Sequence, residues 1–576
     1  MVIRKIYASE VYMTRLLKNG MIVNVFTNSL EKKNVLMSTE GMILGVGNYD
    51  TADEIIDVSN KILCPGFIDG HIHIESTTLM PHELAKVCLP CGTVAIVADP
   101  HEICNVCGLD GLAFILSSSE GLPMTTYIML PSCVPATKFD ESGAKLTAKD
   151  LKYFYSHSRV LGLAEMMNYP GVINDDLEVM EKINDAKKMN KIINGHAPLL
   201  TGEALDKYIV AGITDDHECS SELEAKERIQ KGQWVMIREG TSARNLEGLI
   251  SLFDEPYCQR CLLVTDDKHP HDILMNGHID NIIRKAVSLG KSAITGIRMA
   301  SLQAAQCFGL KNVGAIAPGY KANILVLNDL NTIDINDVYV NGNLVVKNKR
   351  VIDFEIPNVR PEILKNIYRT FYMDDLKEDD FHIEDKHTDC RVIEIIKDQL
   401  LSNELICRLN FNKNNGIDIE KDILKIAVCE RHLYTNHKGV GYIKGIGLKS
   451  GAIASSVSHD SHNLVIIGTN NKDMAIAGNA IKKMGGGLCV VENGDVLAQM
   501  ALPLAGLMTT KSAKEISNEN ENVRNSARKI GSNYDIEPFM LMAFMGLAVI
   551  PHLKITTLGL VDVDKQEIVP LFFENK

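Results

Sequence analysis

The chain has 576 residues, 45% of them hydrophobic, and a formal net charge of −13. At about 100–200 residues per domain, this length predicts about three domains. The acidic balance argues against a nucleic-acid-binding surface, which needs a basic stripe. The N-terminus lacks the apolar stretch of a signal peptide, and no run of about 18 apolar residues predicts a membrane span. The 14 scattered cysteines are typical of reduced thiols, so we expect a cytoplasmic protein without nucleic-acid or membrane partners.

The two flanks of the first 355 residues share one pattern, in which short runs alternate apolar and polar residues between glycine turns. Residues 20–64 show this pattern, and it returns at 322–346, where Asn341-Gly342 is typical of a hairpin turn. We therefore predict one small β-sandwich domain built from residues 1–64 and 314–355.

The central region, residues 65–313, alternates short apolar strands with helical stretches such as 176–189 and 220–230. The strands are expected at 63–68, 94–98, 126–130, 160–164, 191–195, 212–214, 234–237 and 262–265. Eight strand–helix units in about 250 residues favour an α/β fold of the (β/α)8 TIM-like barrel type. A doubly wound open sheet is the structural alternative.

A third region, residues 360–576, predicts a separate C-terminal α/β domain. It contains apolar strands at 423–428 and 464–468 and a helix at 473–484. The charged segment 374–386 is either a linker or an exposed helix. The longest apolar tract, 539–549, is too short to span a membrane and predicts a core helix.

Polar side chains follow seven of the predicted barrel strands at their carboxyl ends, where such barrels place their active sites. On the first strand, His71 and His73 are two residues apart and therefore point to the same face. The later strand ends carry Asp99, His101 and Glu102, then Glu165, His196, His217, Arg238 with Glu239, and Asp266. Histidine occurs at four of these ends, which is more than scattered surface histidines would give.

This mixture of imidazoles and carboxylates is the ligand set of divalent transition metals. Two metal ions about 3.5–4 Å apart need a bridging anion, and Glu165 is placed to provide it. Such a pair of ions lowers the pKa of a shared water to near neutrality. Asp266 is the candidate to take the proton of that water and return it to the leaving group, and it can also bind metal. The residues therefore predict a hydrolytic two-metal site.

Several segments of the chain are similar to those of a known family. Residues 65–73, the histidines of the fifth and sixth strands, Asp266 and the later segment 314–323 resemble the amidohydrolase superfamily. The segments 73–77, 98–103, 193–198, 215–218, 238–240, 265–267 and 458–463 resemble its adenine deaminase branch. Two departures from the superfamily are Asn323, where aspartate is more usual, and Glu165, where many members have a carboxylated lysine. The branch also has glutamate there.

The resemblance implies a hydrolase that converts adenine, a small-molecule substrate, into hypoxanthine and ammonia with two Mn²⁺ or Fe²⁺ ions. Zn²⁺ shares the same ligands, so the native metal stays open. The implied ligands are His71, His73, Glu165, His196, His217 and Asp266. Asp216 and Glu218 are expected to orient these ligands. The oligomeric state also stays open, with a homo-oligomer among the options.

Deamination at purine C6 requires a proton on the neighbouring ring nitrogen, which Glu239 or Glu102 can supply. Asp99, His101 and Arg238 are expected at the purine edge. In the third region, His459, Asp460 and Asn463 are expected to contribute to the purine pocket as this domain closes over the barrel mouth. The alternatives are salt bridges that fix loops and, for 458–463, a polar turn.

Two other functions stay open at this stage. The nearer one is another binuclear-metal amidohydrolase, acting on a cyclic amide or an N-acetyl amino sugar, although these usually lack a third domain of this size. The remoter one is a catalytically inactive scaffold, which typically loses metal ligands. The cysteine-based zinc deaminase pattern is not met, because Ile103 rather than proline precedes Cys104.

Overall fold

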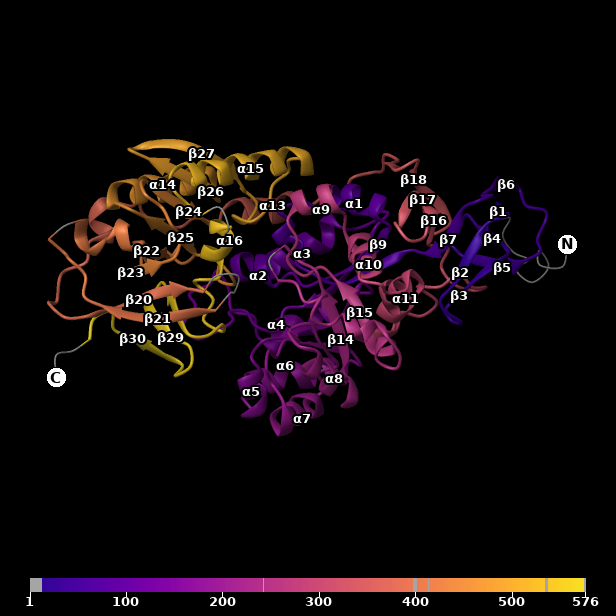
Figure 1. Ribbon diagram of the computed structural model, residues 1–576, viewed down its shortest axis with the longest axis horizontal. Coiled ribbons are helices and arrows are strands. Elements are labelled where there is room, and N and C mark those ends of the chain that lie inside the picture. Colours follow the sequence, from indigo (N-terminus) through magenta and orange to yellow (C-terminus); the bar gives the residue numbers. More distant parts are fainter. Residues whose placement is uncertain (1–12, 242, 397–400, 413, 534–536, 574–576) are drawn as a thin grey trace.

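A computed structural model describes residues 13–241, 243–396, 401–412, 414–533 and 537–573 (Figure 1). The N-terminal strands lie at one end of the long axis, the barrel lies in the middle and the third region lies at the other end (Figure 1). None of the helices in these ranges has the length and apolar character needed to cross a membrane.

The β-sandwich combines strands from both flanks of the barrel. One sheet has the order β5-β4-β1-β6, and the other has the order β19-β18-β17-β16-β7-β2-β3. In the second sheet Leu325 of β16 lies opposite Cys64 of β7, so the two flanks hydrogen-bond to each other. The strands are β1 Thr14–Lys18, β2 Met21–Asn24, β3 Ser29–Lys32, β4 Asn34–Ser38, β5 Ile43–Gly47, β6 Glu54–Asp57, β7 Ile62–Pro65, β16 Ile324–Asp329, β17 Asp334–Val340, β18 Asn343–Lys347 and β19 Arg350–Val351.

The central region forms a closed parallel barrel, which confirms the predicted α/β fold class. Its strands are β8 Phe67–Ile72, β9 Thr93–Ala98, β10 Thr125–Leu130, β11 Val160–Met166, β12 Ile192–Gly195, β13 Asp215–Asp216, β14 Trp234–Arg238 and β15 Cys261–Val264. Parallel ladders join β8 to β12 and β13 to β15. Backbone bonds close the ring at both gaps: Thr214 N donates to Ile193 O at 3.0 Å, and Asp266 N donates to His71 O at 2.9 Å.

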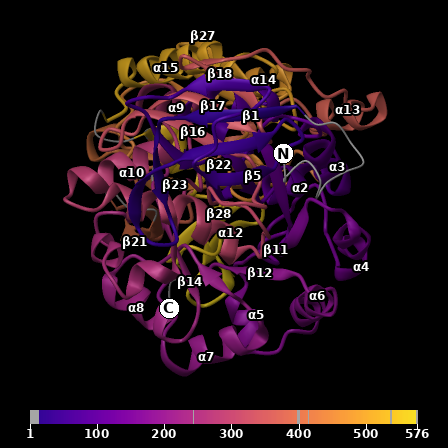
Figure 2. The same ribbon diagram turned by 90° about the vertical axis from the view of Figure 1, so that its right-hand side faces the viewer.

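Successive side chains of each strand point alternately into the barrel and toward the surrounding helices. Ala95 and Val97 of β9 share one apolar cluster with Met129, Met236 and Leu262 from other strands. Side chains from these separate strands meet in the interior of the barrel, so these five residues fill it. The helices are α1 Pro81–Cys88, α2 His101–Cys107, α3 Leu109–Ser118, α4 Ala148–Leu151, α5 Tyr169–Ile173, α6 Leu177–Lys188, α7 Gly202–Ala211, α8 Glu222–Gln230, α9 Pro270–Asn276, α10 Ile279–Ser288, α11 Ala293–Arg298 and α12 Ala304–Cys307. Seen from the sandwich end, α6, α7 and α8 lie outside β11, β12 and β14 (Figure 2).

The structure corrects two predicted strands. The segment 63–68 is divided between two sheets, because β7 ends at Pro65 and β8 begins at Phe67. Proline at this point cannot donate to a continuing ladder. The sixth strand begins at Asp215 rather than at 212, because Gly212 ends α7 with φ of 118°.

The third region is built on a mixed sheet with the order β21-β20-β23-β22-β25-β24-β26-β27. Its elements are α13 Pro361–Tyr368, β20 Cys390–Ile395, β21 Ser402–Cys407, β22 Ile423–Cys429, β23 Lys438–Lys444, β24 Ala452–Ser455, β25 Leu464–Gly468, α14 Asn471–Met484, β26 Gly487–Glu492, β27 Asp495–Ala501, α15 Ala513–Lys529, α16 Pro538–Ala543, β28 Leu553–Thr556, β29 Gly559–Asp562 and β30 Glu567–Val569. The segment 374–386 is irregular apart from one 3₁₀ turn. The predicted core helix at 539–549 ends early, at Ala543.

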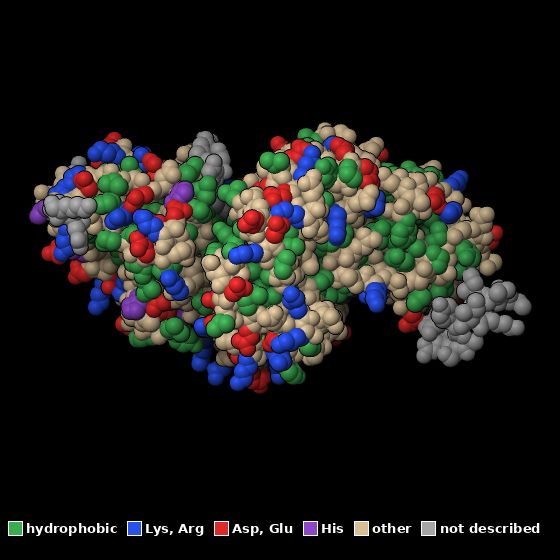
Figure 3. All heavy atoms as spheres, turned by 90° about the horizontal axis from the view of Figure 1, so that it is seen from below, with side chains coloured by type: hydrophobic (Ala, Val, Ile, Leu, Met, Phe, Trp, Pro, Cys, Tyr) green, Lys and Arg blue, Asp and Glu red, His purple; other side chains and the backbone are tan. Residues whose placement is uncertain are grey.

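This third region lies against the barrel through several contacts. Thr509 N donates to Thr78 O at 2.9 Å, and α15 packs against α9, where His271 Nδ1 lies 3.0 Å from Ser517 Oγ. On the face shown in Figure 3, acidic and basic side chains are interspersed over the barrel and the third region. That face therefore carries no continuous basic stripe.

Gly342 gives a test of the sandwich. Its φ is 74°, and an added Cβ would lie 2.1 Å from Ser38 O of the facing sheet. Gly121 has a similar φ of 69°, but its Cβ would meet nothing within 4 Å. An alanine at either position would be strained by the left-handed backbone conformation, so this cost cancels in the comparison. Gly342→Ala should therefore lower the free energy of unfolding by about 1–3 kcal/mol more than Gly121→Ala. Calorimetry should show a lower thermal midpoint for Gly342→Ala, and equal midpoints would contradict this packing.

Candidate functional site

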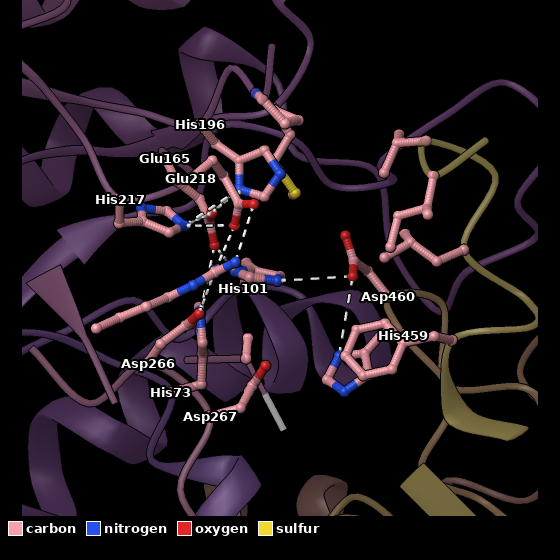
Figure 4. A pocket seen from close by; sticks show the side chains of 18 of the residues that line it. His73, His101, Glu165, His196, His217, Glu218, Asp266, Asp267, His459 and Asp460 are labelled. Atoms are coloured by element: carbon pink, nitrogen blue, oxygen red, sulfur yellow. Dashed lines mark hydrogen bonds and ion pairs between the residues drawn. The ribbon is translucent and has the colours of Figure 1, made fainter. Parts of the chain in front are cut away.

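A cavity of about 390 Å³ lies at the carboxyl ends of the barrel strands. The labelled barrel side chains lie on one side of it, and His459 and Asp460 of the third region lie on the other (Figure 4). The remaining wall on the third-region side is apolar and includes Met540, Phe544, Leu547, Val549 and Ile550. The site is therefore a polar cluster facing an apolar wall.

Histidines from three parts of the barrel converge at this mouth. His71 is the penultimate residue of β8 and His73 follows the strand, with ring centroids 4.8 Å apart. The ring of His217, just after β13, stacks on His71 at 4.4 Å, and His196 lies 5.1 Å from His217. His73 Nδ1 lies 3.1 Å from the backbone oxygen of Asp99. Donation by Nδ1–H to that oxygen leaves the Nε2 lone pair facing the cluster.

The carboxylate of Glu165, on β11, lies between two sets of imidazoles. Its Oε2 lies 2.6 Å from His196 Nδ1 and 3.2 Å from His217 Nε2. Its Oε1 lies 3.4 Å from His73 Nε2 and 3.9 Å from His71 Nε2. Burial alone would raise the pKa of Glu165, but His196 and His217 keep it well below its usual range. Each oxygen thus faces a different set of nitrogen donors.

Asp266 completes the cluster from the end of β15. Its backbone adopts a left-handed conformation with φ of 59°, which aspartate tolerates better than most residues. Its Oδ1 lies 3.1 Å from His73 Nε2 and 3.5 Å from His71 Nε2, and its Oδ2 accepts from Arg238 Nη1 at 2.7 Å. Burial would raise the pKa of Asp266, but Arg238 and the two histidines hold it well below its usual value.

The cluster fits divalent metal ions. His71 Nε2 is buried and makes no hydrogen bond, which is costly unless another partner is present. Four groups of residues each have ligand atoms that lie within 4.8 Å of one another: His71–His73–Asp266, His71–Glu165–His217, His196–His217–Glu218 and His73–Asp99–His101–Glu165. Neutral imidazole and carboxylate are suitable donors for such ions. All six ligands implied by the sequence therefore lie in one connected cluster.

A second polar cluster joins the barrel to the third region. Glu102, in the first turn of α2, places Oε1 2.6 Å from His459 Nδ1, and its Oε2 contacts His462 Nε2. His101 links the two clusters, with Nδ1 3.6 Å from Glu165 Oε1 and Nε2 3.5 Å from Glu102 Oε1. Asp460 Oδ1 lies 3.9 Å from His101 Nε2.

Charge is distributed unevenly in this second cluster. Burial would raise the pKa of Glu102, but His459, His462 and His101 keep it well below its usual range. Burial would lower the pKa of His459, yet Glu102 raises it to about 9. At neutral pH the proton of this pair therefore resides on His459, and Glu102 is an anion.

Three predicted site residues, one catalytic and two substrate-binding, are not among the residues that line the cavity. Glu239 accepts a hydrogen bond from Lys285 at 3.0 Å, because residues adjacent to Arg238 on a strand point to the opposite face. Asp99 lies behind His101 and accepts from its backbone N–H at 3.1 Å. Asn463 donates to Glu141 O at 2.7 Å. Glu102, His101, Arg238, His459 and Asp460 do line the cavity.

Sequence reasoning missed three residues at the site. His462 was inside the segment 458–463 but was not singled out, although its spacing of three from His459 was a usable signal. Asp267 was visible as a carboxylate next to the predicted ligand Asp266, and it lines the cavity together with Glu218, which was expected to orient ligands. Phe544, whose ring stacks on His459 at 4.5 Å, gave no signal beyond lying in an apolar tract.

Comparisons with known proteins agree with this geometry. Residues 62–345 match the amidohydrolase family, and residues 399–567 match the adenine deaminase C-terminal domain. Adenine deaminase 2 of Carboxydothermus hydrogenoformans is 42% identical over 558 residues, covering 96% of each chain. Adenine deaminase of Kosmotoga olearia is 42% identical over 565 residues, covering 97% of this chain and 96% of that one. Adenine deaminase of Clostridium acetobutylicum is 41% identical over 552 residues, covering 95% of each.

The cluster predicts a loss of metal when one imidazole is removed. His217→Ala takes away a nitrogen 3.2 Å from Glu165 and should reduce the divalent metal that copurifies with the protein, measured by plasma mass spectrometry. The control is His387→Ala, because the His387 side chain is 82% exposed and lies beside Asp385. Equal metal content in the two variants would contradict the role of His217.

Proposed function

The chain belongs to the adenine deaminase family of the amidohydrolases, and from this premise we propose that it deaminates adenine in the cavity at the barrel mouth. The observation that carries the proposal is the position of Glu165. Its two carboxylate oxygens face separate donor sets, His196 and His217 on one side and His71 and His73 on the other. The cavity volume of about 390 Å³ is ample for a purine base.

The residues proposed to hold two divalent metal ions are His71, His73, Glu165, His196, His217 and Asp266. When bound, such ions bring the pKa of a water molecule near neutrality, so that hydroxide is available at pH 7. We propose Mn²⁺ or Fe²⁺ as the native ions; Zn²⁺ can use the same donors, and the supply in the cell decides among them.

Asp266 is proposed to handle the proton of the attacking water. Its carboxylate is ionised, because Arg238 lies 2.7 Å from Oδ2, and Oδ1 faces the histidine cluster. It therefore accepts a proton as the water oxygen bonds to C6 of adenine, and it returns that proton to the departing nitrogen. The C6–N bond breaks, ammonia leaves and hypoxanthine keeps the oxygen.

The purine ring needs a proton at the nitrogen next to C6 as electrons move onto it. The pair formed by His459 and Glu102 holds such a proton at the cavity wall, with His459 Nδ1 2.6 Å from Glu102 Oε1. We propose that Glu102 relays the proton of His459 to the ring. The second proton of the attacking water, which is left on the C6 oxygen, returns to the pair of His459 and Glu102 as ammonia departs. The apolar wall around Phe544 lies beside this pair.

The substrate assignment predicts the outcome of a panel assay. The protein, stripped of metal and supplied with Mn²⁺ or Fe²⁺, should release ammonia from adenine and form an equal amount of hypoxanthine. Dihydrouracil and hydantoin, which are cyclic amides, should stay intact under the same conditions. Hydrolysis of a cyclic amide without turnover of adenine would favour the other amidohydrolase activity.

The relay predicts a specific defect for Glu102→Gln. The amide keeps the shape of the side chain but cannot pass on a proton, so kcat should fall by about 10²- to 10⁴-fold, with normal metal content. Glu120→Gln is the matched control, since the Glu120 carboxylate is 68% exposed and pairs with Arg159. A wild-type kcat for Glu102→Gln would exclude the relay.

A further inference from the structure

The segment 458–463 of the third region reaches into the barrel mouth. It connects β24 to β25, and each of its six residues is buried, with exposed fractions of 5% or less. Two of its side chains, His459 and His462, both contact the carboxylate of Glu102, which lies more than 350 positions earlier in the chain. The carboxylate is thus clamped between two imidazoles from another domain.

The backbone fixes the protonation pattern of His462. Ser458 N–H donates to His462 Nδ1 at 3.1 Å, so the lone pair of Nδ1 is engaged. In the neutral ring the proton must therefore reside on Nε2, the atom that faces Glu102. Burial lowers the pKa of His462, which keeps the ring neutral. His462 is consequently a hydrogen-bond donor to Glu102 and not an acceptor from it.

The same bond argues against a metal ion between these residues. Glu102, His459 and His462 have ligand atoms close enough for one ion. A metal on Nε2 would require the other nitrogen, Nδ1, to carry the proton of the neutral ring. Nδ1 instead accepts from Ser458, so the arrangement suits a hydrogen-bonded clamp.

The segment is held in place by a buried arginine. Arg431 donates from Nε to His462 O at 2.5 Å and from Nη2 to Ala505 O at 2.9 Å. His432 Nε2 lies 2.8 Å from Ser461 O. The ring of Phe544 covers the face of His459 at 4.5 Å. These contacts leave both imidazoles little freedom to turn away from Glu102.

We propose that His462 is a positioning residue, which aims the carboxylate of Glu102 at the substrate through its fixed Nε2–H. The proton relay at the barrel mouth is then complete only when the third region is docked. This inference rests on the proposed deaminase function and on the role of Glu102 in it. It assigns to His462 no contact with the substrate.

Two substitutions of His462 distinguish the effect of its Nε2–H donor from the effect of the shape of its ring. His462→Gln can keep an N–H near the position of Nε2, whereas His462→Asn keeps an acceptor for Ser458 N–H but cannot reach Glu102. We expect His462→Asn to lower kcat by about 10- to 100-fold with little change in KM for adenine, because a hydrogen bond to a charged group is lost. His462→Gln should stay close to wild type. Ser461→Ala, in the same segment, is the control, since its hydroxyl lies beside Asn463 rather than Glu102.

Metal content and thermal midpoints are measured for every variant alongside the kinetics. Wild-type metal content and midpoint in His462→Asn, together with its low kcat, would support positioning. A wild-type kcat for His462→Asn would overturn the inference, and so would an equal loss in both variants that follows a lower midpoint. Loss of a metal ion from His462→Asn would also overturn it in favour of a metal site. Failure of the wild-type protein to deaminate adenine would instead contradict the proposed function.

Discussion

The buried carboxylate of Glu165 is the group on which the rest of the site depends. An ionised carboxylate without partners in a protein interior costs several kcal/mol, so it must be surrounded by donors or cations. The barrel supplies them from separate strands: His73 after β8, His196 after β12 and His217 after β13. Those strand ends meet only because the ring closes, through Thr214 to Ile193 and through Asp266 to His71. The geometry of the site therefore depends on the closed barrel.

The third region changes what this cluster can do. Its apolar wall, with Met540 and Leu547, makes the cavity less polar, and charges interact more strongly in such surroundings than in water. It also supplies His459, whose proton is shared with Glu102 of the barrel. A barrel alone would contain the proposed metal ligands but neither the apolar cover nor the two imidazoles that hold Glu102. The third region therefore supplies part of the cavity lining and two imidazoles that hold the carboxylate of Glu102.

Much of the site could be predicted from the sequence, because strand ends in a barrel converge and chemistry-bearing residues follow them. His71, His73, Glu165 and Asp266 were found in this way, and the structure brings them together. The placement of Glu239 could not be predicted, because pattern analysis did not decide which of two adjacent residues faces the mouth. In the structure Arg238 lines the cavity and Glu239 accepts a hydrogen bond from Lys285. The role of His462 could not be predicted, since it depends on how two domains dock. The split of 63–68 into two strands likewise depends on which sheet each half joins.

The proposed bridging of two metal ions by Glu165 is tested most directly by a metal titration. Protein stripped of metal is supplied with increasing Mn²⁺, and hypoxanthine formation is followed at each step. Activity should rise in proportion to added metal and reach a plateau at two ions per chain, and Glu165→Gln should fail to reach it. A plateau at one ion per chain, full activity without added metal, or an unchanged titration for Glu165→Gln would contradict the bridging role.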